Sequence, residues 1–107
     1  GISGRDLTTG ALGDGIAEQC RLMFELVRAI LSAAGASLSD VLKISVYLRS
    51  DQPRDDLNHE WVQAFPDPHI RPVRHVVKYD GLPEGMLIQC EFLAVVTDGP
   101  TDDQDRT

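Results

Sequence analysis

Apolar residues recur at steps of three and four in the first third of the chain. They are Ile16, Cys20, Met23, Val27, Ile30 and Ala34. This spacing places them on one face of an α-helix, because about 3.6 residues complete each turn. Gly35 follows directly, and glycine is common just beyond a helix end. The pattern predicts a helix over residues 15–34.

The next segment alternates between apolar and polar positions. Its apolar members are Leu42, Ile44, Val46 and Leu48. A period of two predicts a strand with one buried face. Residues 50–53 then provide helix-start chemistry, with Asp51 as a cap and Pro53 in the first turn. This second helix is expected to end at Pro66.

Two more strand patterns follow, at residues 73–79 and 86–96, separated by the turn-forming residues 80–85. We predict an antiparallel hairpin in which Tyr79 pairs with Met86. Because side chains alternate between the faces of a sheet, this register puts four residues on one face. They are Arg74, Val76, Gln89 and Glu91. The arginine then forms either a solvated ion pair with Glu91 or an anion site, and spacing alone favours the ion pair.

The order of elements predicts an α+β fold, with two helices on one face of a mainly antiparallel sheet. Residues 1–97 are expected to form a single domain, and residues 98–107 an acidic, flexible tail. The other sheet face mixes Tyr47 and charged groups with apolar residues. Such a face is typical of a subunit contact, so we expect an oligomer.

Composition restricts the partners. A net charge of −7 disfavours nucleic acid, whose binding relies on clustered Lys and Arg. Cys20 and Cys90 lack the spacing of metal ligands and are expected to be small buried residues of a reducing cytoplasm. No apolar run is long enough to cross a membrane, and no signal peptide is recognised. His59, His69 and His75 do not form a metal spacing either.

Four groups of short segments occur in a characteristic order. They are Ser3-Gly-Arg with Leu7-Thr-Thr-Gly, Ile16-Ala-Glu-Gln with Ala34-Gly-Ala-Ser-Leu-Ser-Asp-Val-Leu-Lys, Asn58 with Trp61 and Phe65, and Pro72-Val-Arg with Leu82-Pro and Ile88-Gln-Cys-Glu. With these segments the chain resembles the RidA family, also called the YjgF/YER057c/UK114 or endoribonuclease L-PSP-like family. The resemblance extends from Gly1 to about Val96.

The resemblance implies a chorismate-mutase-like α+β fold and a homotrimer with active sites between subunits. It also implies cofactor-free hydrolysis of 2-imino or enamine carboxylic acids to 2-keto acids and ammonia. Arg74 would hold the substrate carboxylate, which a guanidinium binds through two parallel hydrogen bonds. The resemblance places Ser3, Gly4, Asn58 and Val76 near the substrate.

The chain departs from the family at several points. Family members usually have Glu where this chain has Gln89, and that Glu is the proposed activator of water. Glutamine can hold a water molecule but cannot take its proton, so Glu91 is the alternative catalytic group. Val76 stands where Cys is frequent. An N-terminal strand that usually precedes Ser3 is expected to be missing or trimmed.

Three functions remain open at this point. The first is an imine or enamine deaminase with Arg74, Gln89 and Glu91 in the active site. The second is a non-catalytic trimeric binder of keto or amino acids, which Gln89 favours. The third is a pathway-specific family member acting on an aminomuconate-like or biosynthetic intermediate. All three predict a small carboxylate ligand and need neither a metal nor a cofactor.

Overall fold

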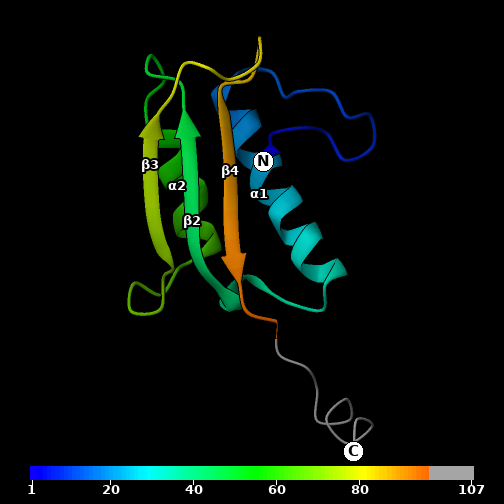
Figure 1. The fold of residues 1–107 in the computed structure, drawn as a ribbon, viewed down its shortest axis with the longest axis vertical. Coiled ribbons are helices and arrows are strands. Elements are labelled where there is room, and N and C mark those ends of the chain that lie inside the picture. The colour runs from blue at the N-terminus through cyan, green and yellow to red at the C-terminus, as the bar shows by residue number, and fades with distance from the viewer. Residues whose placement is uncertain (97–107) are drawn as a thin grey trace, which may run out of the picture.

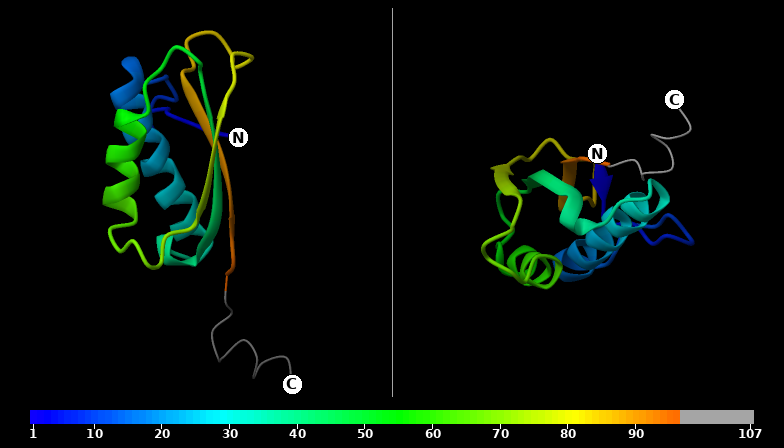
Figure 2. Two further views of the ribbon diagram at one scale, coloured as in Figure 1. Left: turned by 90° about the vertical axis from the view of Figure 1, so that its left-hand side faces the viewer. Right: turned by 90° about the horizontal axis from the view of Figure 1, so that it is seen from below.

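The computed structural model describes residues 1–96, so the tail predicted at residues 98–107 lies outside the described part. The elements are β1 (Ile2–Ser3), α1 (Gly15–Ala33), the 3₁₀ helix η1 (Leu38–Asp40), β2 (Val41–Leu48), α2 (Asp55–Ala64), β3 (Val73–Lys78) and β4 (Ile88–Ala94). Figure 1 shows the sheet in front of both helices, and Figure 2 shows that the helices lie on the same side of it. The predicted α+β fold, with two helices on one sheet face, is confirmed.

Helix α1 begins at the predicted residue, whereas helix α2 begins later than predicted. The start of α1 at Gly15 agrees with it, and Gly35 takes a φ of 76° just beyond the helix end. The start of α2 is Asp55, later than the predicted 50–53. Those residues form a turn instead, in which the Gln52 amide donates a hydrogen bond of 3.0 Å to the Arg49 carbonyl.

Within residues 1–96, four strands form one sheet in the order β1-β4-β2-β3. Strand β2 is antiparallel to β4 and parallel to β3, so the predicted hairpin between residues 73–79 and 86–96 is wrong. Strand β2 is an interior strand and β3 is an edge strand, in agreement with their burial: Ile44 and Val46 of β2 are 0% exposed, whereas β3 has no fully buried side chain. Because α2 carries the chain back along the sheet, β3 runs parallel to β2.

This register separates the four residues that we predicted on one face. Arg74 pairs with Ile44 and Val76 pairs with Val46, and both partners are buried beneath the helices. Arg74 and Val76 therefore lie on the helix-facing side of β3.

Gln89 and Glu91 lie on the opposite side of the sheet. They pair with Tyr47 and Ser45, which alternate with the buried residues of β2. We call this side the open face, since no helix of the described residues covers it (Figure 2). The predicted pairing of Arg74 with Glu91 is therefore wrong, because β2 lies between their strands.

A shift of register near Leu42 changes one further prediction. The pairing of β2 with β4 is irregular between Val41 and Lys43. Val41 is consequently 6% exposed and Leu42 is 50% exposed. The alternation predicted that Leu42 belongs to the core, and this prediction is wrong. A bulge of this kind adds a residue to one strand and turns its side chain outward.

The two cysteines are buried in the core, as predicted. Neither forms a disulfide, and burial raises the pKa of both thiols to about 12, which makes them poor nucleophiles. Within residues 1–96, no helix has the length and apolar character needed to cross a lipid bilayer. The same part of the chain contains no group of three or more His, Cys, Asp or Glu side chains able to hold a metal ion.

Candidate active site

The side chain of Arg74 is held between β3 and α2. Its Nη1 donates a hydrogen bond of 2.7 Å to Oδ1 of Asn58, and its Cζ lies 5.1 Å from the ring centre of Trp61. Asn58 and Trp61 are three residues apart on α2, so both project from one side of the helix. We call Arg74, Asn58 and Trp61 the arginine site.

The arginine site carries an uncompensated positive charge. The ion pairs within residues 1–96 join Arg21 to Glu18 and Glu25, and none involves Arg74. Partial burial, and secondly the charge of Arg54, lowers the pKa of the Arg74 guanidinium. A half-buried guanidinium stays protonated and favours an anionic partner. Asn58 accepts one of its five N–H groups, which leaves N–H groups for an external carboxylate.

A second polar group lies on the open face. The Tyr47 hydroxyl donates a hydrogen bond of 3.0 Å to Oε1 of Glu91, and the ring of Tyr79 meets that of Tyr47 edge-on. The bond to Glu91 and the negative charge of this carboxylate raise the pKa of Tyr47. Gln89 lies beside Tyr47 and also pairs with Ser3 of β1. We call Tyr47, Gln89 and Glu91 the open-face group.

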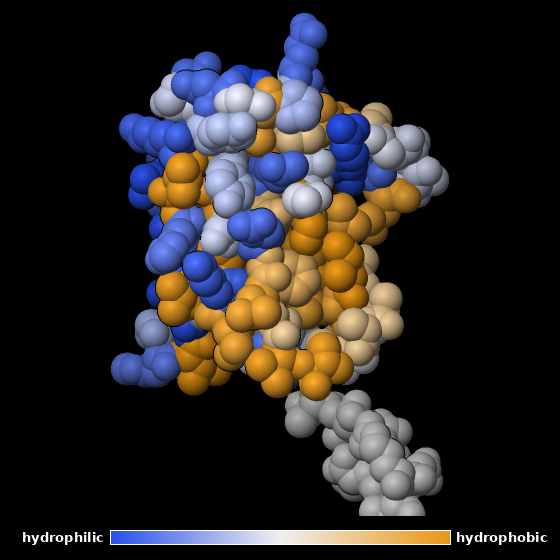
Figure 3. Space-filling view, viewed as in Figure 1, coloured by the Kyte–Doolittle hydropathy of each residue, from blue (hydrophilic) through white to orange (hydrophobic). Residues whose placement is uncertain are grey.

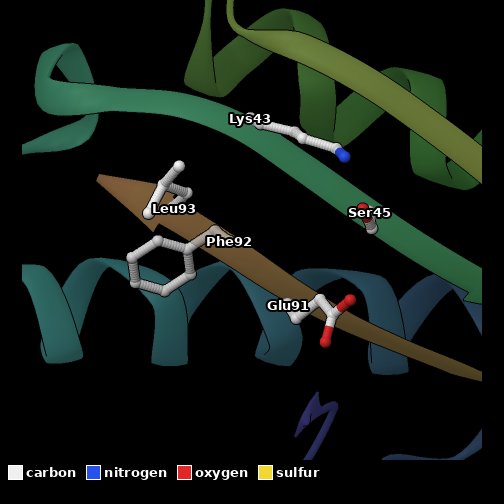
Figure 4. A pocket seen from close by; sticks show the side chains of 5 residues that line it. All are labelled: Lys43, Ser45, Glu91, Phe92 and Leu93. Atoms are coloured by element: carbon white, nitrogen blue, oxygen red, sulfur yellow. The ribbon is translucent and has the colours of Figure 1, made fainter. Parts of the chain in front are cut away.

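A hollow of about 260 Å³ adjoins the open-face group. It is lined by Lys43 and Ser45 of β2 and by Glu91, Phe92 and Leu93 of β4. Figure 4 shows the Lys43 amine and the Glu91 carboxylate on opposite sides of Ser45. The hollow therefore combines an amine, a hydroxyl and a carboxylate with an apolar wall.

The arginine site and the open-face group do not meet within one chain. Arg74 and Val76 lie on the helix-facing side of β3, where Asn58 of α2 binds Arg74. Ser3, Gln89 and Glu91 lie on the opposite side of the sheet. The sequence-predicted site residues are thus divided into two separate sets. A ligand that contacted both sets would need a second subunit to supply one of them.

Gly4 is explained by packing within the chain. A Cβ atom at this position would lie 2.1 Å from the backbone oxygen of Gln19 on α1. Gln19 is 2% exposed, and its side chain binds two loops. Its Nε2 donates to the carbonyls of Gly13 and Gly85, and its Oε1 accepts a hydrogen bond from the Leu87 amide. Gly4 therefore lets the N-terminal segment pack directly on α1.

Replacing Gly4 with Ala is expected to lower the free energy of unfolding by about 3 kcal/mol, because the new methyl group meets backbone that cannot rotate away. Gly10→Ala provides a matched control. Gly10 has a φ of 75° but open space around it, so only backbone strain of about 1 kcal/mol applies. Urea unfolding followed by circular dichroism measures both losses. Equal losses would contradict the packing explanation.

The structure adds two residues to the predicted site. Trp61 supports the Arg74 guanidinium while its own side chain is 7% exposed. Its spacing of three from Asn58 was the available sequence signal. Tyr47 binds Glu91. The alternation of residues 42–48 places Tyr47 on the same face as the charged groups, but its contact with Glu91 depends on the pairing of β2 with β4, which the sequence does not predict.

The open face also carries exposed apolar side chains around the polar group. Val73 and Val77 on β3 and Leu93 on β4 are 57%, 45% and 60% exposed. Figure 3 shows hydrophobic residues gathered over the lower half of this face. An apolar area of this kind on a small chain is typical of a protein contact.

Comparison with known proteins gives consistent matches. Residues 1–96 match the family model described as Endoribonuclease L-PSP. A RutC family protein of Pyrococcus horikoshii is 37% identical over 90 residues, which cover 83% of this chain and 70% of that protein. A 2-iminobutanoate/2-iminopropanoate deaminase of Salmonella typhimurium is 30% identical over 91 residues, covering 84% and 71%.

Solved structures agree with these sequence matches. The crystal structure of RidA from the Antarctic bacterium Psychrobacter sp. superimposes with a TM-score of 0.80 at 33% identity. The match covers 88% of this chain and 75% of the Psychrobacter chain. The described residues therefore have the fold of that protein.

Proposed function

The chain belongs to the endoribonuclease L-PSP family, which includes RidA, and we propose that it hydrolyses small 2-imino or enamine carboxylic acids to 2-keto acids and ammonia. Named relatives in this family are imine deaminases. The observation that carries the proposal is the arginine site: a half-buried guanidinium without a carboxylate partner among residues 1–96, held by Asn58 and Trp61.

Arg74 would bind the substrate carboxylate through two parallel hydrogen bonds. Asn58 and Trp61 restrict the rotation of the guanidinium, so less side-chain entropy is lost when the substrate binds. The bound carboxylate would fix the position of the adjacent C2 atom, at which the reaction occurs.

The reaction adds water to C2 of the C=N bond, and the C–N bond of the resulting carbinolamine then breaks. The water oxygen becomes the keto oxygen, and the nitrogen leaves as ammonia with the protons that water supplies. Glu91 is the open-face carboxylate that we assign to accept and return a proton, because the Gln89 amide can only hold the water. Tyr47 would orient Glu91 through its hydrogen bond to Oε1.

We propose a homotrimer in which the arginine site of one subunit faces the open-face group of the next. Two features support it: the site residues are divided between two regions of the chain, and Val73, Val77 and Leu93 expose apolar surface on the open face. Burying that surface between copies would favour association by about 25 cal/mol for each Å². An RNA-cleaving role is not proposed, since the chain has a net charge of −7.

Ammonia release tests the proposal. The wild-type protein should accelerate ammonia release from 2-iminobutanoate generated freshly by an amino acid oxidase. Heat-unfolded protein is the control: it measures the ammonia release that the buffer and the unfolded polypeptide cause without an active site. Equal rates with folded and unfolded protein would exclude deamination of this substrate.

A non-catalytic binder of small keto or amino acids is the second candidate, and Gln89 favours it. Such a binder would give a calorimetric signal with 2-oxobutyrate but no acceleration of ammonia release. Glu introduced at position 89 would then supply the missing base and create activity. A Gln89→Glu variant that binds 2-oxobutyrate but remains inactive would show that this position does not limit turnover.

A further inference from the structure

Helix α2 carries its charges on two distinct sides. Asp56, His59 and Glu60 line a hollow shared with α1. Arg54, Asn58 and Trp61 follow the spacing i, i+4, i+7 and therefore project from another side. Asn58 and Trp61 contact Arg74, so this second side faces β3. Arg54 precedes α2 by one residue, and its carbonyl accepts a hydrogen bond of 2.8 Å from the Asn58 amide, so it lies one helical turn from Asn58. The charge of Arg54 also acts on Arg74, which places it near the arginine site.

Strand β3 brings a further cation to the same region. Lys78 pairs with Leu48, which is 1% exposed, so Lys78 lies on the helix-facing side together with Arg74 and Val76. Neither Arg54 nor Lys78 forms an ion pair within residues 1–96. A chain with a net charge of −7 thus places Arg54, Arg74 and Lys78 around one short edge without internal carboxylate partners.

We propose that Arg54 forms a second anion position beside Arg74, which makes imines of four- and five-carbon dicarboxylic amino acids preferred substrates. This inference rests on the proposed function. Arg54 precedes Asn58, the residue that binds Arg74, by four positions, which is about 6 Å of helix rise. This offset is of the order that separates the two carboxylates of such a diacid. Val76 lies between Arg74 and Lys78 along the strand and provides an apolar surface for the methylene groups.

The charges favour this arrangement. Arg54 and Arg74 repel each other, and this repulsion contributes to the lowered pKa of Arg74 after the larger effect of burial. A ligand with one carboxylate neutralises one guanidinium, whereas a dicarboxylate neutralises both. The second contact also discriminates against apolar substrates, because an alkyl group placed beside Arg54 would exclude water from a charge without replacing its hydrogen bonds.

Calorimetry with two keto acids tests the inference without requiring turnover. The wild-type protein should bind 2-oxoglutarate about fivefold more tightly than 2-oxobutyrate at low ionic strength. Low ionic strength is needed because Arg54 is exposed, so salt screens its contribution. Arg54→Gln should remove this preference and leave the affinity for 2-oxobutyrate within about twofold. Arg54→Lys should retain part of the preference for 2-oxoglutarate that Arg54→Gln loses, because lysine keeps the positive charge. Arg28→Gln, which removes an exposed arginine from α1, provides the charge-matched control.

The outcomes separate the two proposals. Equal affinity of the wild-type protein for both keto acids, or an equal loss for both in Arg54→Gln, would overturn the second anion position while leaving the deaminase proposal intact. Ammonia release from the two parent imines should follow the same preference. Affinities for both keto acids that do not change in Arg74→Ala would instead contradict the carboxylate anchor on which the proposed function depends.

Discussion

Replacing Arg74 with Ala is expected to reduce kcat/KM for 2-iminobutanoate at least about hundredfold. Hydrogen bonds to charged groups contribute about 1.5–3 kcal/mol each, and a forked guanidinium makes two of them to one carboxylate. In the proposed mechanism Arg74 binds the substrate carboxylate both before and during the reaction, so most of the loss should occur in KM rather than in kcat. Steady-state ammonia release over a range of imine concentrations measures the two constants.

Two further variants make this result specific. Arg74→Lys keeps the positive charge but cannot form two parallel hydrogen bonds to the carboxylate, so we expect a loss of kcat/KM smaller than that of Arg74→Ala. Arg28→Ala removes an exposed arginine of α1 and should leave both constants unchanged. Because Arg74 also packs over Trp61, Arg74→Ala should lower the free energy of unfolding by about 1 kcal/mol. A kcat/KM within twofold of wild type would show that Arg74 does not hold the carboxylate.

Periodicity predicted the elements of this fold but not which strands are neighbours. The apolar spacing of α1 gave its position to within one residue, because one helix face is buried along its whole length. The turn residues at 80–85 suggested a hairpin. Turn chemistry describes the local path of the backbone, and it does not exclude the insertion of β2 between the strands that the turn connects.

The same limit applies to the candidate site. The resemblance identified Arg74 and Asn58. In the structure, Nη1 of Arg74 lies 2.7 Å from Oδ1 of Asn58. The sequence-based register placed Arg74 with Glu91, although pairing with the buried Ile44 turns Arg74 to the other side. A strand register depends on which partner buries the more apolar surface, and this information belongs to the whole sheet rather than to one segment.

Mixing two inactive variants is expected to recover activity if the site is shared between subunits. Arg74→Ala lacks the anchor, and Glu91→Gln lacks the proton acceptor that we assign to the open face. At an imine concentration well below KM, each variant alone should retain about 1% of wild-type activity or less. In mixed trimers, an active site needs a native arginine site from one subunit and a native open-face group from its neighbour. Random assembly at a one-to-one ratio gives about a quarter of the wild-type sites.

Recovery of about a quarter of the activity distinguishes a shared site from one contained in a single chain. If one chain supplied both Arg74 and Glu91, every site would lack one of them in any mixture, and the activity would remain that of the separate variants. The variants should be co-refolded from urea and their trimeric mass checked by light scattering, with separately refolded and then combined samples as the control. Full activity of Glu91→Gln alone would instead remove Glu91 from the proton-transfer step, because its amide occupies the same space but cannot accept the proton of water.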